Sequence, residues 1–135
     1  MKIYFAGSIS SGRQDVAVYQ KIISILKQYG QVLTEFIGNS NLSEQGEAKL
    51  TDKEIHDRDL EWLLSADLLV AEVSNPSLGV GYEIGRALEN KIKVICLYKK
   101  TEGKRLSAMI KGAPGIKVMI YENLDDLDEL IKLNL

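Results

Sequence analysis

Glu83 is a carboxylate at a position where the sequence pattern favours an apolar side chain. Apolar residues with helical spacing run through residues 80–88, and Glu83 follows Val80 by three positions and precedes Ala87 by four. Helical geometry therefore places its carboxylate on or beside the stripe that faces the protein interior. Near the first turn of a helix, the helix dipole helps to keep such an acid ionised, as a nucleophile requires. A solvated first-turn acid is the alternative interpretation.

A second acid, Asp59, raises the same question in another segment. The pattern predicts a helix over residues 52–66, and its apolar stripe comprises Ile55, Trp62, Leu63 and Ala66. Asp59 falls inside this stripe, whereas Asp57, Arg58 and Glu61 are expected on its wetter flank. We expect Asp59 to point toward the protein or a cleft. The alternative is an acid paired with a core hydroxyl or a helix terminus.

Two turns between predicted strands and helices could bind an anion. The first turn is rich in glycine and serine and consists of Gly7, Ser8, Ile9, Ser10, Ser11, Gly12 and Arg13. Such a loop suits a phosphate, although it is neither a dinucleotide fingerprint nor a P-loop. In the second turn, Ser77 offers a hydroxyl, Gly79 permits close approach of the backbone, and the helix start offers free amides. An ordinary polar connection is the alternative for the first turn.

Strands and helices alternate along the whole chain. Strands are predicted at residues 2–6, 31–36, 68–73, 93–98 and 116–121, and helices at residues 14–29, 52–66, 80–88 and 106–112, with Gly30 ending the first helix and Asn123 capping a last one. This alternation predicts one domain, residues 1–135, with a doubly wound five-stranded parallel sheet in the flavodoxin-like or Rossmann-like order 2-1-3-4-5.

The predicted strand order places the anion-binding turns together. Strands one and three are neighbours in this order, so the loop from Ser8, the side chain of Ser77 and the carboxylate of Glu83 should surround one crevice. Tyr4 lies in the first strand, either as a core aromatic with a satisfied hydroxyl or as a hydrogen-bond donor to the crevice. The polar segment 37–51 is predicted to be a mobile flap.

Composition limits the classes of function. The chain has 135 residues, a net charge of -2 and one cysteine, Cys96, which is expected to be a buried thiol in a strand. The charge gives no attraction to nucleic acid or to an anionic membrane, and no signal peptide or membrane-spanning stretch is visible. We therefore expect a soluble cytoplasmic protein. His56 and Cys96 are too isolated to suggest zinc, no cofactor is indicated, and the basic turn at residues 99–105 is expected to be solvated.

Several short motifs together resemble the 2'-deoxynucleoside 5'-phosphate N-hydrolases, a family in the nucleoside 2-deoxyribosyltransferase superfamily. They lie at residues 4–9, 12–13, 32–35, 55–56, 59–62, 70–73, 76–83 and 106–110. The resemblance implies that Glu83 is the nucleophile at C1' of the deoxyribose and that Asp59 and Tyr4 assist at the sugar and the departing base. It also implies that the 7–13 loop and Ser77 hold the 5'-phosphate, while Ser107 reaches the phosphate of the neighbouring subunit in a homodimer.

The implied activity is hydrolysis of a deoxynucleoside monophosphate to free base and 2-deoxyribose 5-phosphate. An oxocarbenium-like state forms more easily without a 2'-hydroxyl, and a carboxylate can trap it covalently before water attacks. A partly buried second acid with a raised pKa could serve the leaving base. Where those hydrolases commonly carry an arginine, this chain has Ser10. Alternative functions are a deoxyribosyltransferase, in which a second base replaces water, and a non-catalytic flavin or nucleotide binder.

Overall fold

The structure is a computed structural model that describes residues 1–8, 15–34 and 50–135. Its strands are β1 (Lys2–Ala6), β2 (Gln31–Val32), β3 (Leu68–Glu72), β4 (Lys93–Lys99) and β5 (Ile116–Tyr121), and its helices are α1 (Val16–Leu26), α2 (Asp52–Ser65), α3 (Leu78–Glu89), α4 (Ala108–Lys111) and α5 (Asp126–Asn134). All pairings are parallel, in the order β2-β1-β3-β4-β5, which confirms the predicted topology. Most of the predicted flap and of the first turn, residues 37–49 and 9–13, lies outside the described residues.

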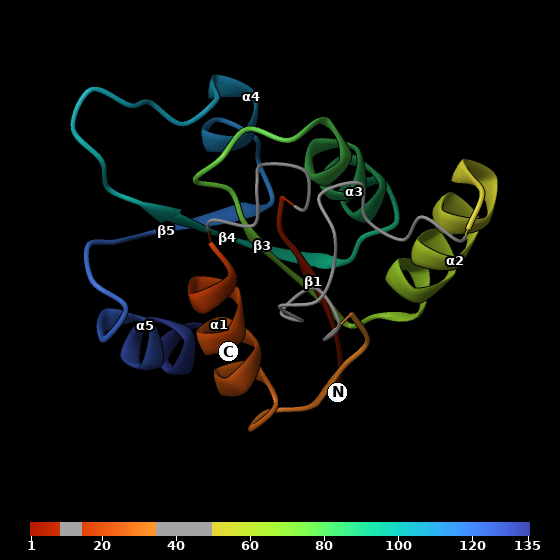
Figure 1. The fold of residues 1–135 in the computed structure, drawn as a ribbon, viewed down its shortest axis with the longest axis horizontal. Helices are drawn as coiled ribbons and strands as arrows, with labels where there is room; N and C mark the ends of the chain where they lie inside the picture. The colour runs from red at the N-terminus through yellow and green to blue at the C-terminus, as the bar shows by residue number, and fades with distance from the viewer. Residues whose placement is uncertain (9–14, 35–49) are drawn as a thin grey trace.

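Helices cover both faces of the sheet, and the alternation of strand residues decides what each face buries (Figure 1). Ile3 and Phe5 of β1 belong to the core that contains the buried residues of α1 and α5. Tyr4 and Ala6 face the opposite way and pack in the core with residues of α2 and α3. The side chain of Tyr4 therefore points to the face of the sheet that α2 and α3 cover.

Strand β2 is shorter than predicted because a side chain takes over its hydrogen bonding. The amide of Leu33 still donates to the carbonyl of Ile3 at 2.9 Å. One residue on, the buried hydroxyl of Thr34 accepts from the amide of Phe5 at 2.9 Å and donates to its carbonyl at 2.6 Å. The Thr34 side chain thus satisfies both backbone groups of Phe5 that a longer strand would have paired.

Glycine 30 does not end α1 as predicted. The helix ends at Leu26, and the Tyr29 amide returns to the Leu26 carbonyl at 2.9 Å in a tighter turn. A Cβ at Gly30 would lie 2.2 Å from the carbonyl oxygen of Met1, so the chain needs glycine there for a close crossing of backbone. The prediction identified the right residue for the wrong physical reason.

The other helix ends are set by short polar side chains. Thr51 and Glu54 form a complete capping box at the start of α2. Asn123 was predicted to cap the last helix, but α5 begins at Asp126, whose carboxylate accepts from the Asn123 amide at 3.0 Å. Helix α4 spans only Ala108–Lys111, shorter than the predicted segment 106–112.

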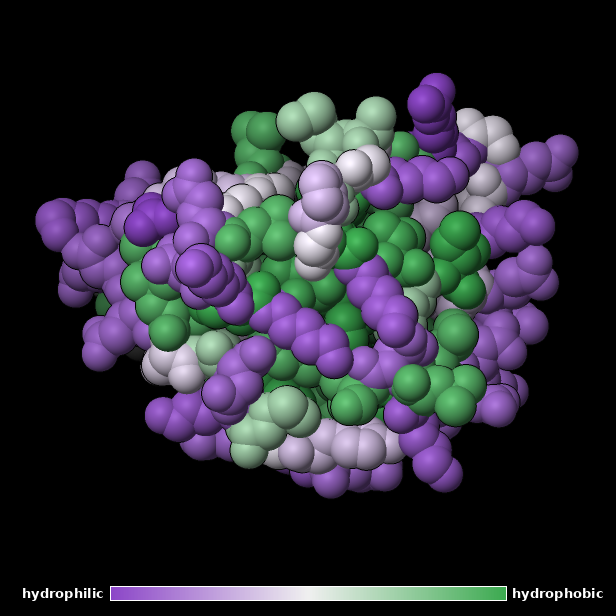
Figure 2. Space-filling model, turned by 180° about the vertical axis from the view of Figure 1, so that it is seen from behind, coloured by the Kyte–Doolittle hydropathy of each residue, from purple (hydrophilic) through white to green (hydrophobic). Residues whose placement is uncertain are grey.

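The chain buries its cysteine and leaves some large apolar side chains exposed. Cys96 is fully buried, and burial raises the pKa of its thiol to about 12, which confirms the predicted buried thiol. Figure 2 shows hydrophobic side chains gathered on the face seen from behind, with hydrophilic side chains around and across them. In the described ranges, no helix is long and apolar enough to cross a membrane. The same ranges contain no group of three His, Cys, Asp or Glu side chains able to hold a metal ion.

Candidate active site

Tyr4 and Glu83 form the centre of the site. Tyr4 is 1% exposed on β1, and its hydroxyl donates a hydrogen bond to Oε2 of Glu83 on α3. The glutamate therefore points inward from the first half of α3 and is not a solvated first-turn acid. The Tyr4 hydroxyl is both satisfied and directed at the crevice, so the two interpretations of this tyrosine are compatible.

The Glu83 carboxyl is hard to ionise. Burial raises its pKa to about 7, the hydrogen bond from Tyr4 lowers it, and the negative charge of Asp59 raises it. We expected the helix dipole to keep Glu83 ionised, but desolvation outweighs such favourable terms. Burial and the neighbouring Glu83 charge also raise the pKa of Tyr4, so its phenol stays protonated as the donor. Near neutral pH, Glu83 is poised between its two protonation states.

Asp59 lies on α2 beside an arginine that the sequence pattern had placed on the wetter flank. Nε and Nη2 of Arg58 lie 3.0 Å and 2.9 Å from Oδ1 of Asp59. The Arg58 guanidinium carbon also lies 4.8 Å from the ring centroid of Trp62. A planar guanidinium can pair with a carboxylate while it stacks on an indole. The Arg58 side chain is 26% exposed, so it lies at the border of the wetter flank, where it contacts both Asp59 and Trp62.

A cavity of about 270 Å³ joins the two acids. It is lined by Gly7, His56, Asp59, Leu60, Leu63, Ser77, Gly79, Val80, Tyr82 and Glu83. The cavity therefore brings together residues from the end of β1, the turn after β3, and both helices of one face. The predicted crevice at the carboxyl ends of β1 and β3 is present, with both carboxylates in its wall.

The first of the predicted anion-binding turns is visible only at its start. A Cβ at Gly7 would lie 2.8 Å from Cζ of Tyr19, so the tyrosine ring packs directly against this glycine. The Tyr19 hydroxyl donates to the carbonyl of Ser8 at 3.2 Å, and Ser8 is buried. Gly7 and Ser8 are thus held against α1, while Ile9, Ser10, Ser11, Gly12 and Arg13 lie outside the described residues.

The second turn presents the start of α3 to the cavity. Oγ of Ser77 accepts from the Val80 amide at 3.3 Å and caps the helix. A Cβ at Gly79 would meet only this Oγ, at 3.9 Å. Packing within the described chain therefore does not require glycine at position 79. A close approach by a ligand is a physical reason for glycine there.

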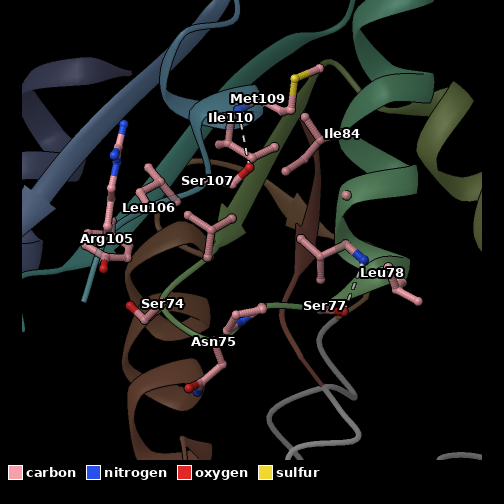
Figure 3. Close-up of a pocket in the computed structure, with 15 residues that line it drawn as sticks. Ser74, Asn75, Ser77, Leu78, Ile84, Arg105, Leu106, Ser107, Met109 and Ile110 are labelled. Carbon is pink, nitrogen blue, oxygen red and sulfur yellow. Dashed lines mark hydrogen bonds between the residues drawn. The ribbon is translucent and has the colours of Figure 1, made fainter. Parts of the chain in front are cut away.

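Ser107 lines a second cavity, of about 400 Å³, which Figure 3 shows. Ser77 and Val80 line both cavities, so they form the wall between them. Oγ of Ser107 accepts from the Met109 amide at 3.2 Å and caps α4. Within one chain, Ser107 is therefore near Ser77 but is not part of the cavity that contains the two acids.

His56 and Tyr82 also line the first cavity, although the motifs 55–56 and 76–83 that contain them gave neither residue a role there. Nε2 of His56 lies 2.8 Å from the Tyr82 hydroxyl, which also accepts from Nη1 of Arg86 at 2.6 Å. This contact joins α2 to α3 beside the acids. The available signal was position: His56 precedes Asp59 by three residues, and Tyr82 directly precedes Glu83.

A family model described as nucleoside 2-deoxyribosyltransferase matches residues 3–127, and the chain belongs to this family. Among its relatives, the 5-hydroxymethyl-dUMP N-hydrolase of Danio rerio is 50% identical over 135 residues, which covers 98% of this chain and 94% of the relative. The putative 2'-deoxynucleoside 5'-phosphate N-hydrolase 1 of Nematostella vectensis is 59% identical over 129 residues, which covers 94% of this chain and 87% of the relative.

Solved structures share the fold at low sequence identity. The CMP N-glycosidase of Clostridium botulinum superposes with a TM-score of 0.75 at 19% identity, over 100% of both chains. The 2-deoxyribosyltransferase of Bacillus psychrosaccharolyticus gives a TM-score of 0.68 at 19% identity, over 95% of this chain and 90% of the other. These two likenesses confirm the fold, and the arrangement of the acids must carry the chemistry.

Proposed function

We propose that this protein hydrolyses the N-glycosidic bond of 2'-deoxynucleoside 5'-monophosphates to free base and 2-deoxyribose 5-phosphate. The observation that carries the proposal is the half-buried hydrogen bond from Tyr4 to Glu83, whose carboxylate lines the same cavity as Asp59. The names of the N-hydrolase relatives agree with it. Most enzymes that cleave glycosidic bonds use two carboxylates that face one cavity.

In the first step, the ionised Glu83 attacks C1' of the sugar. A bond forms between a Glu83 oxygen and C1', the bond from C1' to the base nitrogen breaks, and its electron pair leaves with the base. Tyr4 positions the carboxylate through its hydrogen bond, and Asp59 assists at the sugar and the departing base. The base takes up one proton from solvent water, which the water of the second step returns. Burial leaves the Glu83 oxygens poorly solvated, which makes the ionised form reactive.

In the second step, water attacks C1' on the face that the base has left. The ester bond to Glu83 breaks, the carboxylate is regenerated, and the water gives up one proton as the sugar phosphate forms. Two displacements at one carbon retain its configuration. The product should therefore carry the same anomeric configuration as the substrate when first released.

The 5'-phosphate is proposed to bind at the starts of two helices. Gly7 and Ser8 continue into the 9–13 loop, and Ser77 and Gly79 lie at the amino end of α3, where unpaired amides favour an anion. At the position of a common arginine in the N-hydrolases, Ser10 supplies no charge. The remaining loop residues, including Arg13, would hold the phosphate.

We also propose a homodimer in which Ser107 contacts the phosphate bound by the partner. Leu78 is 96% exposed and Met109 is 81% exposed, and both line the cavity that contains Ser107. Apolar side chains this exposed favour burial in an interface. Sedimentation of a fully active monomer would contradict the dimer without affecting the proposed chemistry.

The test is a chromatographic assay of base release from deoxynucleosides, their 5'-monophosphates and the matching ribonucleotides. We expect base release from the deoxynucleoside monophosphates, poor cleavage of ribonucleotides, and retention at C1' by NMR of the first product. Absence of base release across the panel would overturn the proposed function. Inversion at C1' would overturn the covalent step alone.

Base exchange is the second candidate, because the matching family model is that of a transferase. In this reaction, a second base instead of water attacks the glycosyl ester on Glu83. Incubation of a deoxynucleoside or its monophosphate with a different free base distinguishes the two reactions. Formation of the exchanged product at a rate above that of hydrolysis would favour the transferase.

A further inference from the structure

Glu72 is a buried acid that the proposed reaction does not use. It is the last residue of β3, is 2% exposed, and does not line the cavity of Glu83. One carboxylate oxygen accepts from the Ser74 amide at 2.7 Å, and the other accepts from the Ser74 hydroxyl at 2.9 Å. The Tyr121 hydroxyl, from the last residue of β5, also donates to Glu72. The carboxylate therefore gathers donors from two separate segments.

Ser74 connects this acid to the turn that leads into α3. Its Oγ accepts from the Lys99 amide at 2.8 Å, which ties the turn to the end of β4. The next residue, Asn75, donates through Nδ2 to the carboxylate of Asp15 at the start of α1. Figure 3 shows Ser74, Asn75 and Ser77 following one another along this turn. The path of the backbone from Glu72 to Ser77 is thus fixed at two successive residues.

A carboxylate at position 72 has a free-energy cost. Burial raises the pKa of Glu72, because ionisation is opposed by desolvation despite the three hydrogen bonds. A neutral apolar side chain would avoid that cost but could not accept two bonds from one serine and a third from a tyrosine. The acid therefore selects one arrangement of the turn, in which Ser77 caps α3 and its hydroxyl lies in the wall of the active-site cavity.

We propose that Glu72 is a positioning residue for the phosphate end of the site. Acting through Ser74, it holds the turn so that the Ser77 hydroxyl and the first amides of α3 face the 5'-phosphate. This inference rests on the proposed function, because it assumes that the phosphate binds at Ser77. It assigns Glu72 no contact with the substrate.

The experiment compares a deoxynucleoside monophosphate with the same deoxynucleoside lacking phosphate. Tyr121→Phe removes one donor to Glu72. Ser74→Ala removes another donor to Glu72 together with the acceptor of the Lys99 amide. We expect each to raise KM for the monophosphate about five- to twentyfold, as loss of a well-placed hydrogen bond does. Values of kcat and the kcat/KM for the unphosphorylated substrate should change less than about twofold, because the reacting acids are untouched.

Matched controls separate this role from general support of the fold. Tyr29→Phe removes a hydroxyl from a half-buried tyrosine at the end of α1, and Ser24→Ala removes one from an exposed serine on that helix. Neither should alter the preference for the phosphorylated substrate. A double-mutant cycle of Glu72→Gln with Ser74→Ala should be less than additive in that preference, because both changes break one connection.

The outcome can overturn the inference without overturning the function. Equal losses on both substrates, or an unchanged preference for phosphate in Tyr121→Phe and Ser74→Ala, would show that Glu72 supports only the fold. Calorimetric binding of 2-deoxyribose 5-phosphate gives a readout without turnover, and we expect its Kd to rise by the same factor as KM. Wild-type protein that binds this sugar phosphate but releases no base would reject the proposed hydrolysis and leave the positioning role to be judged by Kd.

Discussion

Glu72 is a buried glutamate and Glu83 a half-buried one near the same edge of the sheet, and their surroundings differ. Glu72 accepts three hydrogen bonds from Ser74 and Tyr121, and it lines neither the cavity of Glu83 nor the cavity of Ser107. Glu83 receives its hydrogen bond from Tyr4, lines a cavity and lies near the like charge of Asp59. Burial raises the pKa of both acids, so burial alone does not distinguish them.

We propose that this difference separates a structural acid, Glu72, from a reactive one, Glu83. Donors from three backbone and side-chain groups use the lone pairs of Glu72 and fix its position. The Glu83 carboxylate retains capacity for a substrate and carries an unfavourable free energy when ionised. Strain of this kind is typical of active sites, where stability is given up for reactivity.

The largest expected effect follows from neutralising the reactive acid. Glu83→Gln should lower kcat for base release at least about a thousandfold, because the nucleophile is lost. The same change should raise the free energy of unfolding at pH 8 by about 2 to 3 kcal/mol, since a pKa of about 7 against an ordinary 4.5 penalises the ionised folded state. Activity assays and urea unfolding at pH 8 measure both. An unchanged rate in a folded variant would exclude Glu83 as nucleophile.

The sign of the stability change can be checked by pH. The folded pKa of Glu83 is raised, so its contribution is most favourable below about 4.5 and is lost as the pH rises through about 7. The gain in the free energy of unfolding of Glu83→Gln should therefore vanish near pH 4.5.

Tyr121→Phe should act in the opposite direction and lower the free energy of unfolding by about 1 to 3 kcal/mol, because it removes a hydrogen-bond donor to Glu72.

The next effect concerns the partners of Glu83. Because the nucleophile must be ionised, kcat/KM of the wild type should rise with pH through an apparent pKa of about 7. Tyr4→Phe removes the bond that lowers this pKa and should move the acid limb to higher pH. Asp59→Asn removes a charge that raises it and should move the limb to lower pH. Each should cost about ten- to a hundredfold in kcat at its own optimum. Shifts in the same direction for both variants would contradict the electrostatic account.

The smallest expected effect distinguishes Gly79, which we propose lies against the bound phosphate, from Gly85, which has no neighbour close to it. A Cβ meets open space at Gly85, and at Gly79 it meets only Oγ of Ser77. Gly85→Ala should stabilise α3 by about 0.5 to 1 kcal/mol with unchanged kinetics. Gly79→Ala should leave thermal stability intact but raise KM for the monophosphate about tenfold, because the methyl group meets the bound phosphate. Equal kinetics for both variants would remove Gly79 from the site.

Much of the fold could be read from periodicity, and the positions of both acids followed from it. Glu83 and Asp59 were found because helical spacing shows which face a side chain takes, and strand order showed that β1 and β3 meet. The ends of elements were less predictable, because they depend on single contacts. The hydroxyl of Thr34 shortens β2, and the Met1 carbonyl explains Gly30.

Most of the site features that the sequence did not predict are contacts between side chains, either within one helix or between two helices. A helical wheel gives the direction of Arg58 from the axis but not its stacking on Trp62, so its contact with Asp59 was missed. The contact of His56 with Tyr82 depends on how α2 packs on α3. The charge state of Glu83 was misjudged because depth of burial is a tertiary quantity that no local pattern contains.

Tyr4 lies on a strand with neighbours on both sides, and this placement has a dynamic consequence. β1 pairs with β2 along one edge and β3 along the other, so freeing Tyr4 requires breaking the centre of the sheet. Hydrogen exchange at the Tyr4 amide should then be as slow as global unfolding allows. The hydrogen bond from Tyr4 to Glu83 is therefore anchored in the sheet, so local opening at the surface would leave it in place.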